Sequence, residues 1–425
     1  MPKKIYTFID LFAGAGGLSE GFVRAGFTPI AHIEMDKYAC NTLKTRACYH
    51  YLKHNNLLSV YESYLKNKKE KEDGNKLWSQ VPDEVVNTVI QAAIGEDTIN
   101  PLFEKVDKLR DGKEIDFIIG GPPCQAYSIA GRARKGKEME NDPRNELYKF
   151  YIMFLKKYKP KMFVFENVLG IISAKRGEPF KDLKECIKEA GYKMDLKVLK
   201  ASDYGVLQDR QRVIIVGWRE ELTHLHYPDL EPIKEKYQVL KDLFSDLPTR
   251  KAGEGSMTGV VEYIKDIKEM QYLEKSKIRG EMNFTTQHLV RPLNDNDRQI
   301  YLMASDLFIK EGKRLQYRNI PKEYQKHKNT ERFQNRFQVV NPYGNSHTVV
   351  AHIAMDGHYY IYPNLKPTLE NVRSISVREA ARLQSFPDDF YFEGSRSAAL
   401  KQIGNAVPVV LAETIAKGVL NIIDI

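Results

Sequence analysis

A cysteine directly after a predicted buried strand is the first candidate for chemistry in this chain. Residues 115–120 form an apolar run that ends in glycine, and residues 121–125 then read Gly-Pro-Pro-Cys-Gln. The two prolines have a fixed φ and no N–H, so they stiffen the backbone just before the thiol of Cys124. A thiol held at one point in space can act as a nucleophile. Because a lone intracellular cysteine is more often a small buried side chain, this interpretation depends on the residues around it.

An acid and two guanidinium groups occupy comparable positions at other predicted strands. Glu166 follows the apolar run 162–165, where burial favours the protonated form of a carboxyl group. An acid that caps the next helix is the alternative. Arg210 and Arg212 come just before the run 213–217. Since alternate residues of an extended chain share a face, both side chains can point at one site, although two surface charges give the same pattern.

A glycine-rich turn provides a candidate cofactor site. The predicted strand 5–11 runs into Phe-Ala-Gly-Ala-Gly-Gly over residues 12–17, and a helical pattern follows. Glycines there let the backbone approach a ligand beneath a helix N-terminus. Glu34, at the end of the next predicted strand, is placed to bind ribose hydroxyls. An adenosine-containing cofactor is therefore expected, but the final glycine of the dinucleotide fingerprint is missing and such turns also occur for packing alone.

These residues can meet if their strands belong to one sheet. The alternation of strand and helix patterns is typical of a doubly wound, mostly parallel α/β sheet, in which ligands bind at the carboxyl ends of strands. Cys124 and Glu166 then share a pocket with the cofactor, whereas Arg212 begins its strand. Such a group suits attack of a thiolate on an electron-poor ring. The predicted strands are 5–12, 29–35, 115–120, 162–166, 194–201 and 212–218, and the predicted helices include 18–25, 38–45, 146–158 and 180–190.

The remaining chain divides into a second domain and a return to the first. Between about 225 and 370 the alternation is lost, and a helix 377–385 after the possible N-cap Ser376 and a helix 409–423 then restore it. The charged segment 66–76 is expected to be an exposed or mobile insertion. Four cysteines lie too far apart for a zinc pattern, so no metal is expected. No targeting or membrane-spanning segment is apparent, which favours a cytoplasmic protein.

Net charge of +9 modestly favours a polyanionic partner. Residues 310–336 hold nine Lys or Arg against three acids, and Tyr317, Tyr324, Phe333 and Phe337 lie between them. Cations with interleaved aromatic rings suit nucleic acid. A solvated helical face is an equally good interpretation of this stretch taken alone.

Taken together, these runs resemble the DNA (cytosine-5) methyltransferases of bacterial restriction-modification systems. The resemblance extends from end to end and keeps the family's motif order. The runs that carry it are FIDLFAGAGG at 8–17, IEMDKYA at 33–39, GGPPCQAYSIAG at 120–131, FENV at 165–168, QDRQR at 208–212, REAARLQSFPDDF at 378–390 and QIGNAVP at 402–408.

The resemblance implies S-adenosyl-L-methionine as cofactor. Phe12 would face the adenine, the glycine turn would hold the methionine part, Glu34 would bind the ribose, and Asp97 is the acid that best fits the adenine amino group. The implied cofactor shell comprises Phe12, Gly14, Ala15, Gly16, Gly17, Leu18, Glu34, Met35, Asp97, Pro123, Leu147, Asn405 and Ala406.

The resemblance also implies a mechanism and partners. A cytosine is flipped out of double-stranded DNA, Cys124 adds to ring carbon 6, Glu166 binds ring N3, and Arg212, with Arg210 beside it, holds the carbonyl oxygen. Residues 126–141 would close over the DNA. Residues 1–230 plus 398–425 would form the catalytic domain and 231–397 the target-recognition domain of a monomer, associated with the nucleoid and paired with a restriction endonuclease.

Three other functions are compatible with part of the sequence. A transfer-RNA cytosine-5 methyltransferase would keep the reaction, but that branch carries a small recognition region and this one is large. A catalytically silent DNA-binding regulator is disfavoured because every expected catalytic residue is present. A nicotinamide-dependent oxidoreductase explains the glycine turn but not Cys124, Glu166 and Arg212 together. The target sequence, the base that removes the carbon-5 proton and the purpose of the 46–95 insertion are not predicted.

Overall fold

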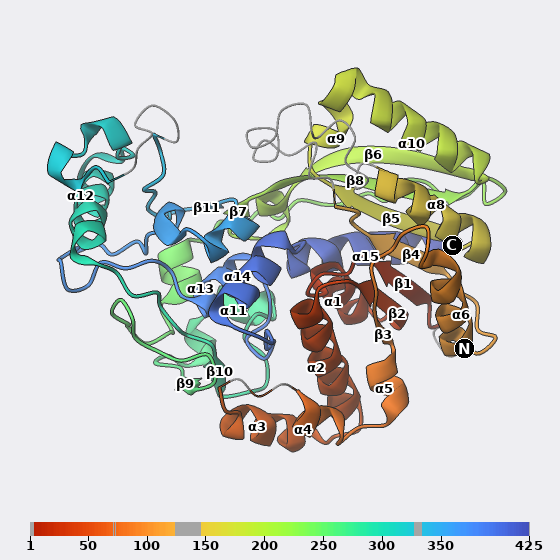
Figure 1. Cartoon of the computed structure of the whole chain (residues 1–425), viewed down its shortest axis with the longest axis horizontal. Coiled ribbons are helices and arrows are strands. Elements are labelled where there is room, and N and C mark those ends of the chain that lie inside the picture. Colours follow the sequence, from red (N-terminus) through yellow and green to blue (C-terminus); the bar gives the residue numbers. More distant parts are fainter. Residues whose placement is uncertain (1–3, 71, 73, 124–145, 327–333, 425) are drawn as a thin grey trace.

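A seven-stranded sheet lies at the centre of the computed structural model, which describes residues 4–70, 72, 74–123, 146–326 and 334–424 (Figure 1). The strand order is β3-β2-β1-β4-β5-β8-β6. The strands are β1 (Thr7–Leu11), β2 (Thr28–Glu34), β3 (Val89–Gln91), β4 (Phe117–Gly120), β5 (Met162–Asn167), β6 (Tyr192–Lys200) and β8 (Gln211–Arg219).

The sheet is parallel except for one strand. β1 pairs in parallel with β2 and β4, β2 with β3, and β4 with β5. β8 runs antiparallel to both of its neighbours, β5 and β6. The predicted doubly wound, mostly parallel sheet is therefore confirmed, and all six predicted strands form within a few residues of their expected bounds. β3 was not predicted, because a three-residue edge strand leaves little pattern in sequence.

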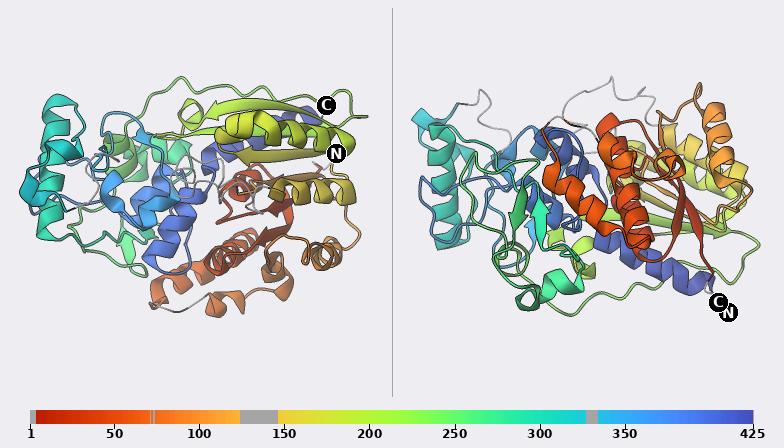
Figure 2. Two further views of the ribbon diagram at one scale, coloured as in Figure 1. Left: turned by 45° about the horizontal axis from the view of Figure 1, so that its top comes forward. Right: turned by 90° about the horizontal axis from the view of Figure 1, so that it is seen from below.

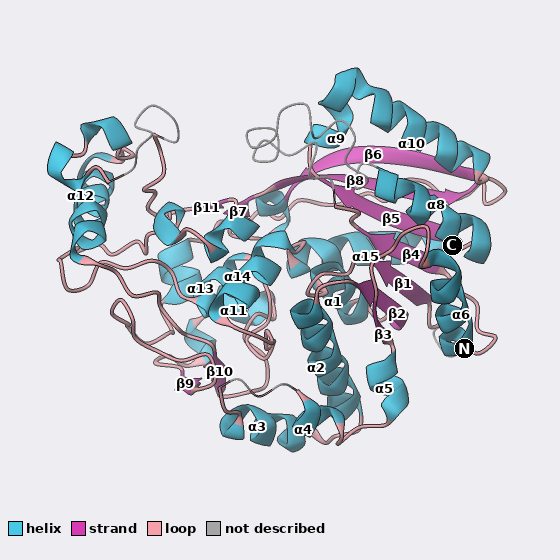
Figure 3. Cartoon of the chain, in the orientation of Figure 1, coloured by secondary structure: helices cyan, strands magenta, loops and turns pink. Residues whose placement is uncertain are grey.

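Helices cover both faces of the sheet (Figure 3). α6 (Ile99–Arg110), α8 (Leu147–Tyr158) and α10 (Glu178–Glu189) pack on one face, and α1 (Gly17–Arg24) and α15 (Val409–Ile423) pack on the other. The stretch Arg396–Ile423 is long and apolar enough to cross a membrane, but 67% of its most apolar window is buried inside the protein. Its composition is explained by its place in the core.

The second half of the chain is less regular. Its longest helix, α12 (Asp295–Glu311), lies with a small hydrophobic cluster far from the sheet, in what we call the outer lobe, residues 293–326 and 334–372 (Figure 2). The other elements are β7 (Gln208–Asp209), a π-helical turn (Val239–Phe244), β9 (Val260–Glu262), α11 (Gln271–Lys275), β10 (Phe284–Thr286), β11 (Ser346–His347), α13 (Val377–Leu383) and α14 (Arg396–Asn405). Ser376 caps α13 as predicted.

The region after α2 (Lys37–His54) is folded. It contains α3 (Leu58–Asn67), α4 (Asn75–Trp78) and α5 (Asp83–Asn87), and α9 (Gly170–Ser173) is a further single turn beyond β5. The prediction that 66–76 is an exposed or mobile insertion is wrong for Lys68, whose side chain is 2% exposed. A lysine in a charged run was assigned to the surface, but this one has a buried carboxylate partner.

Candidate active site

Glu166 and Arg212, two of the predicted catalytic residues, lie at one edge of the sheet. Gly120, at the end of β4, is in register with Leu11 of β1 and Phe165 of β5. On the other side of β5, Asn167 is opposite Val213 of β8. Because β8 is antiparallel, its first residues lie at the edge where the parallel strands end. Arg212 therefore reaches the catalytic edge although it begins its strand.

Glu166 and Arg212 form an ion pair at this edge. Arg212 Nε is 2.7 Å from Glu166 Oε1, and the two side chains are 13% and 14% exposed. Gly121 lies beside them, since a Cβ there would come within 2.7 Å of Glu166 Oε2. The pair is thus held in place but still reaches solvent. The expected protonation of Glu166 stays a prediction.

The chain that leads toward Cys124 is held against two strands, β1 and β5. A Cβ on Gly120 would lie 2.2 Å from the carbonyl oxygen of Leu11, so only glycine fits where the chain leaves β4. Asn167 Nδ2 then donates a hydrogen bond to the carbonyl of Pro122 at 3.1 Å. Cys124 and residues 126–141 lie outside the described residues. Gly121 and Pro122, the described residues shortly before Cys124, lie beside Glu166 and Asn167.

Glu34 holds the glycine turn. Its Oε2 accepts a hydrogen bond from the Gly14 N–H at 2.8 Å, and its Oε1 accepts from the N–H groups of Met35 and Asp36. A carboxylate has about four lone-pair directions, so Glu34 retains acceptor capacity for a ribose hydroxyl. Phe12, directly before the turn, has a φ of 58°. Non-glycine residues held in this region cluster at functional sites.

The turn is also packed against the C-terminal motif. A Cβ on Gly17 would lie 2.3 Å from the carbonyl of Val407, and one on Gly16 would lie 2.7 Å from the Leu43 side chain. Met35, Asp97 and Asn405 are exposed. These positions suit ligand contact. In contrast, Ala15, Leu18 and Ala406 are buried and support the turn from below, and Leu147 and Pro123 are half-buried.

Asp10 is a buried carboxyl group that is not among the residues predicted for the site. It lies in β1 and is 1% exposed, and its Oδ2 makes no hydrogen bond within the described residues. Burial, and then the nearby Glu34, raise the pKa of Asp10 well above its usual range. This shift favours the protonated form of Asp10, which lies in β1 shortly before the glycine turn. Its position in an otherwise apolar strand is the sequence signal that could have identified it.

Arg210 does not join Arg212 in the site, and this prediction is wrong. It is 1% exposed, and its Nη1 donates to the carbonyl of Val349 at 2.7 Å and points to that of Gly404 at 3.5 Å. The N–H of Arg210 bonds to the carbonyl of Gln208, a turn that interrupts the extended chain and its alternation. Burial, and then the charge of Arg212, lower the pKa of Arg210. Arg210 connects the two halves of the molecule.

The basic stretch 310–336 divides into surface and core. Lys310, Lys313, Arg314, Arg318, Lys322 and Lys326 are exposed. Tyr317 and Phe337 are fully buried and stack on each other, and Arg336 lies over the Tyr317 ring. The interpretation of these rings as base-stacking groups is therefore wrong, because they form the core of the outer lobe. Phe333 lies outside the described residues.

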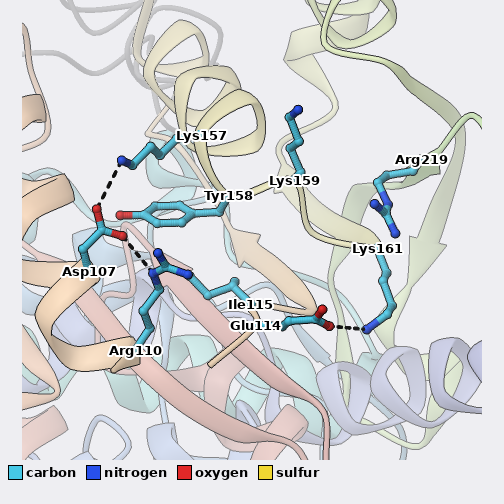
Figure 4. A pocket seen from close by; sticks show the side chains of 9 residues that line it. All are labelled: Asp107, Arg110, Glu114, Ile115, Lys157, Tyr158, Lys159, Lys161 and Arg219. Carbon is cyan, nitrogen blue, oxygen red and sulfur yellow. Dashed lines mark hydrogen bonds and ion pairs between the residues drawn. The ribbon is translucent and has the colours of Figure 1, made fainter. Parts of the chain in front are cut away.

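A cavity of about 220 Å³ lies at the opposite edge of the sheet (Figure 4). Its cations are largely paired: Arg110 and Lys157 with Asp107, and Lys161 with Glu114. The C-terminal ends of α6 and α8 also line the cavity, and basic side chains there offset the helix dipole. It therefore has a structural explanation and no link to the catalytic edge.

Comparisons with known proteins agree with this architecture. The profile of the family described as C-5 cytosine-specific DNA methylase matches residues 6–70 and 83–421. The chain is 36% identical over 450 residues to the type II methyltransferase M.Bpa9945I of Bacillus paralicheniformis, with 98% of this chain and 99% of that protein covered. It is 32% identical over 411 residues to the type II methyltransferase M.FnuDI of Fusobacterium nucleatum, with 96% and 92% covered.

Solved structures share the fold at low identity. A protein described as a DNA modification methyltransferase encoded within an E. coli prophage superposes with a TM-score of 0.61 at 23% identity, covering 99% of this chain and 100% of that chain. The Entamoeba histolytica methyltransferase EhMeth superposes with a TM-score of 0.51 at 15% identity, covering 99% of both chains.

Proposed function

Because the chain belongs to the family of C-5 cytosine-specific DNA methylases and is a DNA cytosine-5 methyltransferase, we propose that Glu166, Arg212 and Cys124 form its catalytic group. The family implies S-adenosyl-L-methionine as the methyl donor. The observation that carries the proposal is the 2.7 Å ion pair of Glu166 and Arg212. Ring N3 and the carbonyl oxygen of cytosine are adjacent, so a carboxyl group and a guanidinium this close together can contact both.

The reaction then follows from these residues. The target cytosine leaves the duplex, since its ring carbons are out of reach within the stack. The thiolate of Cys124 bonds to ring carbon 6, while Glu166 binds N3 and Arg212 binds the carbonyl oxygen. The electron pair moves to carbon 5, which becomes the nucleophile. The bound cofactor supplies a methyl group on a sulfonium. A base removes the carbon-5 proton, and the returning electron pair expels the thiolate of Cys124.

The cofactor is proposed to lie across the glycine turn. The N-terminus of α1, which begins at Gly17, favours its carboxylate, and Glu34 binds its ribose hydroxyls. Phe12, Met35 and Asp97 are assigned to the adenine, and Asn405 to the far wall. These assignments fit the exposure of Met35, Asp97 and Asn405 and the remaining acceptor capacity of Glu34.

The biological setting is also a proposal. The similar type II methyltransferases support a role in restriction-modification, in which methylation protects host DNA from a partner endonuclease. We infer that residues 231–397 read double-stranded DNA, that the enzyme acts as a monomer in the cytoplasm, and that the exposed cations of the outer lobe contact phosphates.

Duplex DNA containing 5-fluorocytosine tests the covalent step. Fluorine replaces the proton that the base must remove, so the bond between Cys124 and carbon 6 should persist and a protein–DNA adduct should accumulate. Cys124→Ser should form no adduct and transfer no methyl group, while it still binds the cofactor. Cys186→Ser, a half-buried cysteine on α10, is the matched control and should behave like the wild type. Methyl transfer by Cys124→Ser would refute the nucleophile assignment.

A further inference from the structure

Helices α3 and α4 share a hydrophobic core with the proposed recognition domain. Tyr61 and Leu65 of α3 and Leu77 of α4 pack in one cluster with Met282 and Phe284, which lie at the start of β10. Figure 1 and the right-hand view of Figure 2 both show α3 beside the two-stranded sheet of β9 and β10. The insertion after α2 therefore contacts both halves of the molecule, and the catalytic mechanism uses none of it.

A buried ion pair lies at the centre of this contact. Lys68 Nζ is 3.0 Å from Glu393 Oε2, and both side chains are 2% exposed. Glu393 Oε1 also accepts hydrogen bonds from the hydroxyls of Tyr64 at 2.7 Å and Thr45 at 2.8 Å. The Lys68 ammonium lies over the ring of Tyr391, 5.1 Å from its centroid. Taking two charges out of water is unfavourable, so such a pair contributes a defined geometry more than stability.

A second buried network anchors the same piece of chain. Arg46 of α2 binds Asp389 at 2.7 Å and Glu20 of α1 at 2.6 Å. The Tyr49 hydroxyl donates to the Asp389 carboxylate, and the Tyr61 hydroxyl of α3 donates to the Asp389 carbonyl, each at 2.7 Å. Residues 386–394 are thus bonded to α2 and α3 at two residues, Asp389 and Glu393, and Arg46 links Asp389 on to Glu20 of α1.

Residues 386–394 are in turn bonded to β10. The Thr285 hydroxyl donates to the carbonyl of Asp388 at 3.0 Å. The Gln287 amide donates to the carbonyl of Phe392 at 2.8 Å and accepts from its N–H at 3.0 Å. A continuous path of buried hydrogen bonds therefore runs from α3 through residues 386–394 to β10, which pairs with β9.

We propose that Lys68 is a positioning residue: through Glu393, it and α3 fix the orientation of the recognition domain relative to the catalytic edge. Changing it should alter DNA affinity and the choice of cytosine. The cofactor site, whose Glu34 and Met35 precede the N-terminus of α2, should stay intact. The inference rests on the proposed role of residues 231–397 in reading DNA.

Lys68→Met tests this role because methionine keeps the apolar stem and removes the charge. Lys69→Met is the matched control, since Lys69 is the next residue and is exposed. For both variants and the wild type, we would measure the KM for duplex DNA, kcat, the Kd for the cofactor, and the methylated positions by bisulfite sequencing. In Lys68→Met, the KM for DNA should rise about tenfold, about 1.4 kcal/mol. Methylation should also spread to less preferred cytosines, with the cofactor Kd within about twofold of the wild type.

The double variant Lys68→Met/Glu393→Leu keeps the test decisive if Lys68→Met fails to fold. It leaves no buried charge without a partner, so it should fold and still show the DNA effects. Either variant with the wild-type KM for DNA and methylation pattern would overturn the proposal, as would parallel loss of cofactor and DNA binding. If the wild type and Lys69→Met themselves methylate cytosines without preference, the proposed recognition function fails instead.

Discussion

In the half of the molecule that contains the sheet, residues 1–230 and 398–425, two apolar layers enclose the sheet. The proposed recognition half, residues 231–397, has few strand ladders and several buried arginines. The four largest fully buried side chains of the described residues are all arginines: Arg210, Arg373, Arg378 and Arg382. Three of these lie within 231–397, and Arg210 reaches Val349 of that region. The same chain thus uses two different ways to satisfy its buried polar groups.

The difference follows from the backbone. In a sheet, each buried carbonyl accepts a ladder hydrogen bond, but an irregular chain leaves carbonyls that need another donor. Arg378 supplies three of these bonds, to the carbonyls of Thr286, Pro387 and Phe390 at 2.9–3.2 Å. A guanidinium offers five N–H donors in one plane, so a single side chain can replace several ladder bonds. Loops of different sequence can therefore be held in a fixed fold.

The largest expected effect separates two kinds of buried arginine. Arg382 is 0% exposed and binds both Asp246 and Asp388 at 2.5 Å. Arg382→Met should lower the free energy of unfolding by about 3–5 kcal/mol, because two buried carboxylates lose the guanidinium that they share. Arg378→Met removes hydrogen bonds to three carbonyls and to the Thr286 hydroxyl but no ion pair, and should cost about 1–3 kcal/mol.

Urea unfolding of the full chain measures these differences, and hydrogen exchange locates them. Amides of β10 should exchange faster in Arg382→Met, while those of β1 and β4 keep their protection. Equal losses of stability in the two variants would show that buried charge is not what distinguishes the recognition half.

A smaller effect on stability, that of the Arg373–Glu379 ion pair, should depend on pH. Burial alone would raise the pKa of Glu379, but the Arg373 guanidinium outweighs it and lowers that pKa to about 2. The folded-state pKa lies below the ordinary value near 4.5, so the stabilisation is complete above pH 4.5 and is lost as the pH falls through 2. Glu379→Gln should cost roughly 3 kcal/mol at pH 6, and the difference should disappear near pH 2.

Thermal unfolding between pH 6 and pH 2 follows this difference. Glu370→Gln, which changes an exposed carboxylate, should match the wild type across the range. A difference that stays constant with pH would mean that the Arg373–Glu379 pair is not the source of the stabilisation.

The strands of the catalytic half were predictable because each is a continuous apolar run bounded by glycine, proline or charge. Glu166 could likewise be assigned to the carboxyl edge. Arg212 begins its predicted strand, and only the antiparallel direction of β8 explains how it reaches that edge. Arg210 was misplaced because alternation holds only for an extended chain, and a turn at 208–210 interrupts it.

The buried charges of the proposed recognition half, and of Lys68 that pairs with it, could not be predicted in this way. Lys68, Arg378 and Arg382 look like surface residues in a sequence, because each partner is distant in the chain or is a backbone carbonyl. Only the three-dimensional path pairs Lys68 with Glu393. Conversely, Tyr317 and Phe337 looked like nucleic-acid contacts because their spacing does not reveal that they pack on each other.

The smallest effect on stability should come from the exposed cations of the outer lobe, where the two halves differ in function. Arg318→Glu combined with Lys322→Glu changes two exposed side chains, so stability should stay within about 0.5 kcal/mol of the wild type. If both contact phosphates, the slope of log K against log salt should become shallower by about two, roughly one per contact. Lys105→Glu, at an exposed position of α6 beside the sheet, should leave the slope unchanged. Binding titrations at several salt concentrations measure both, and equal slopes in all three proteins would remove the outer lobe from the DNA interface.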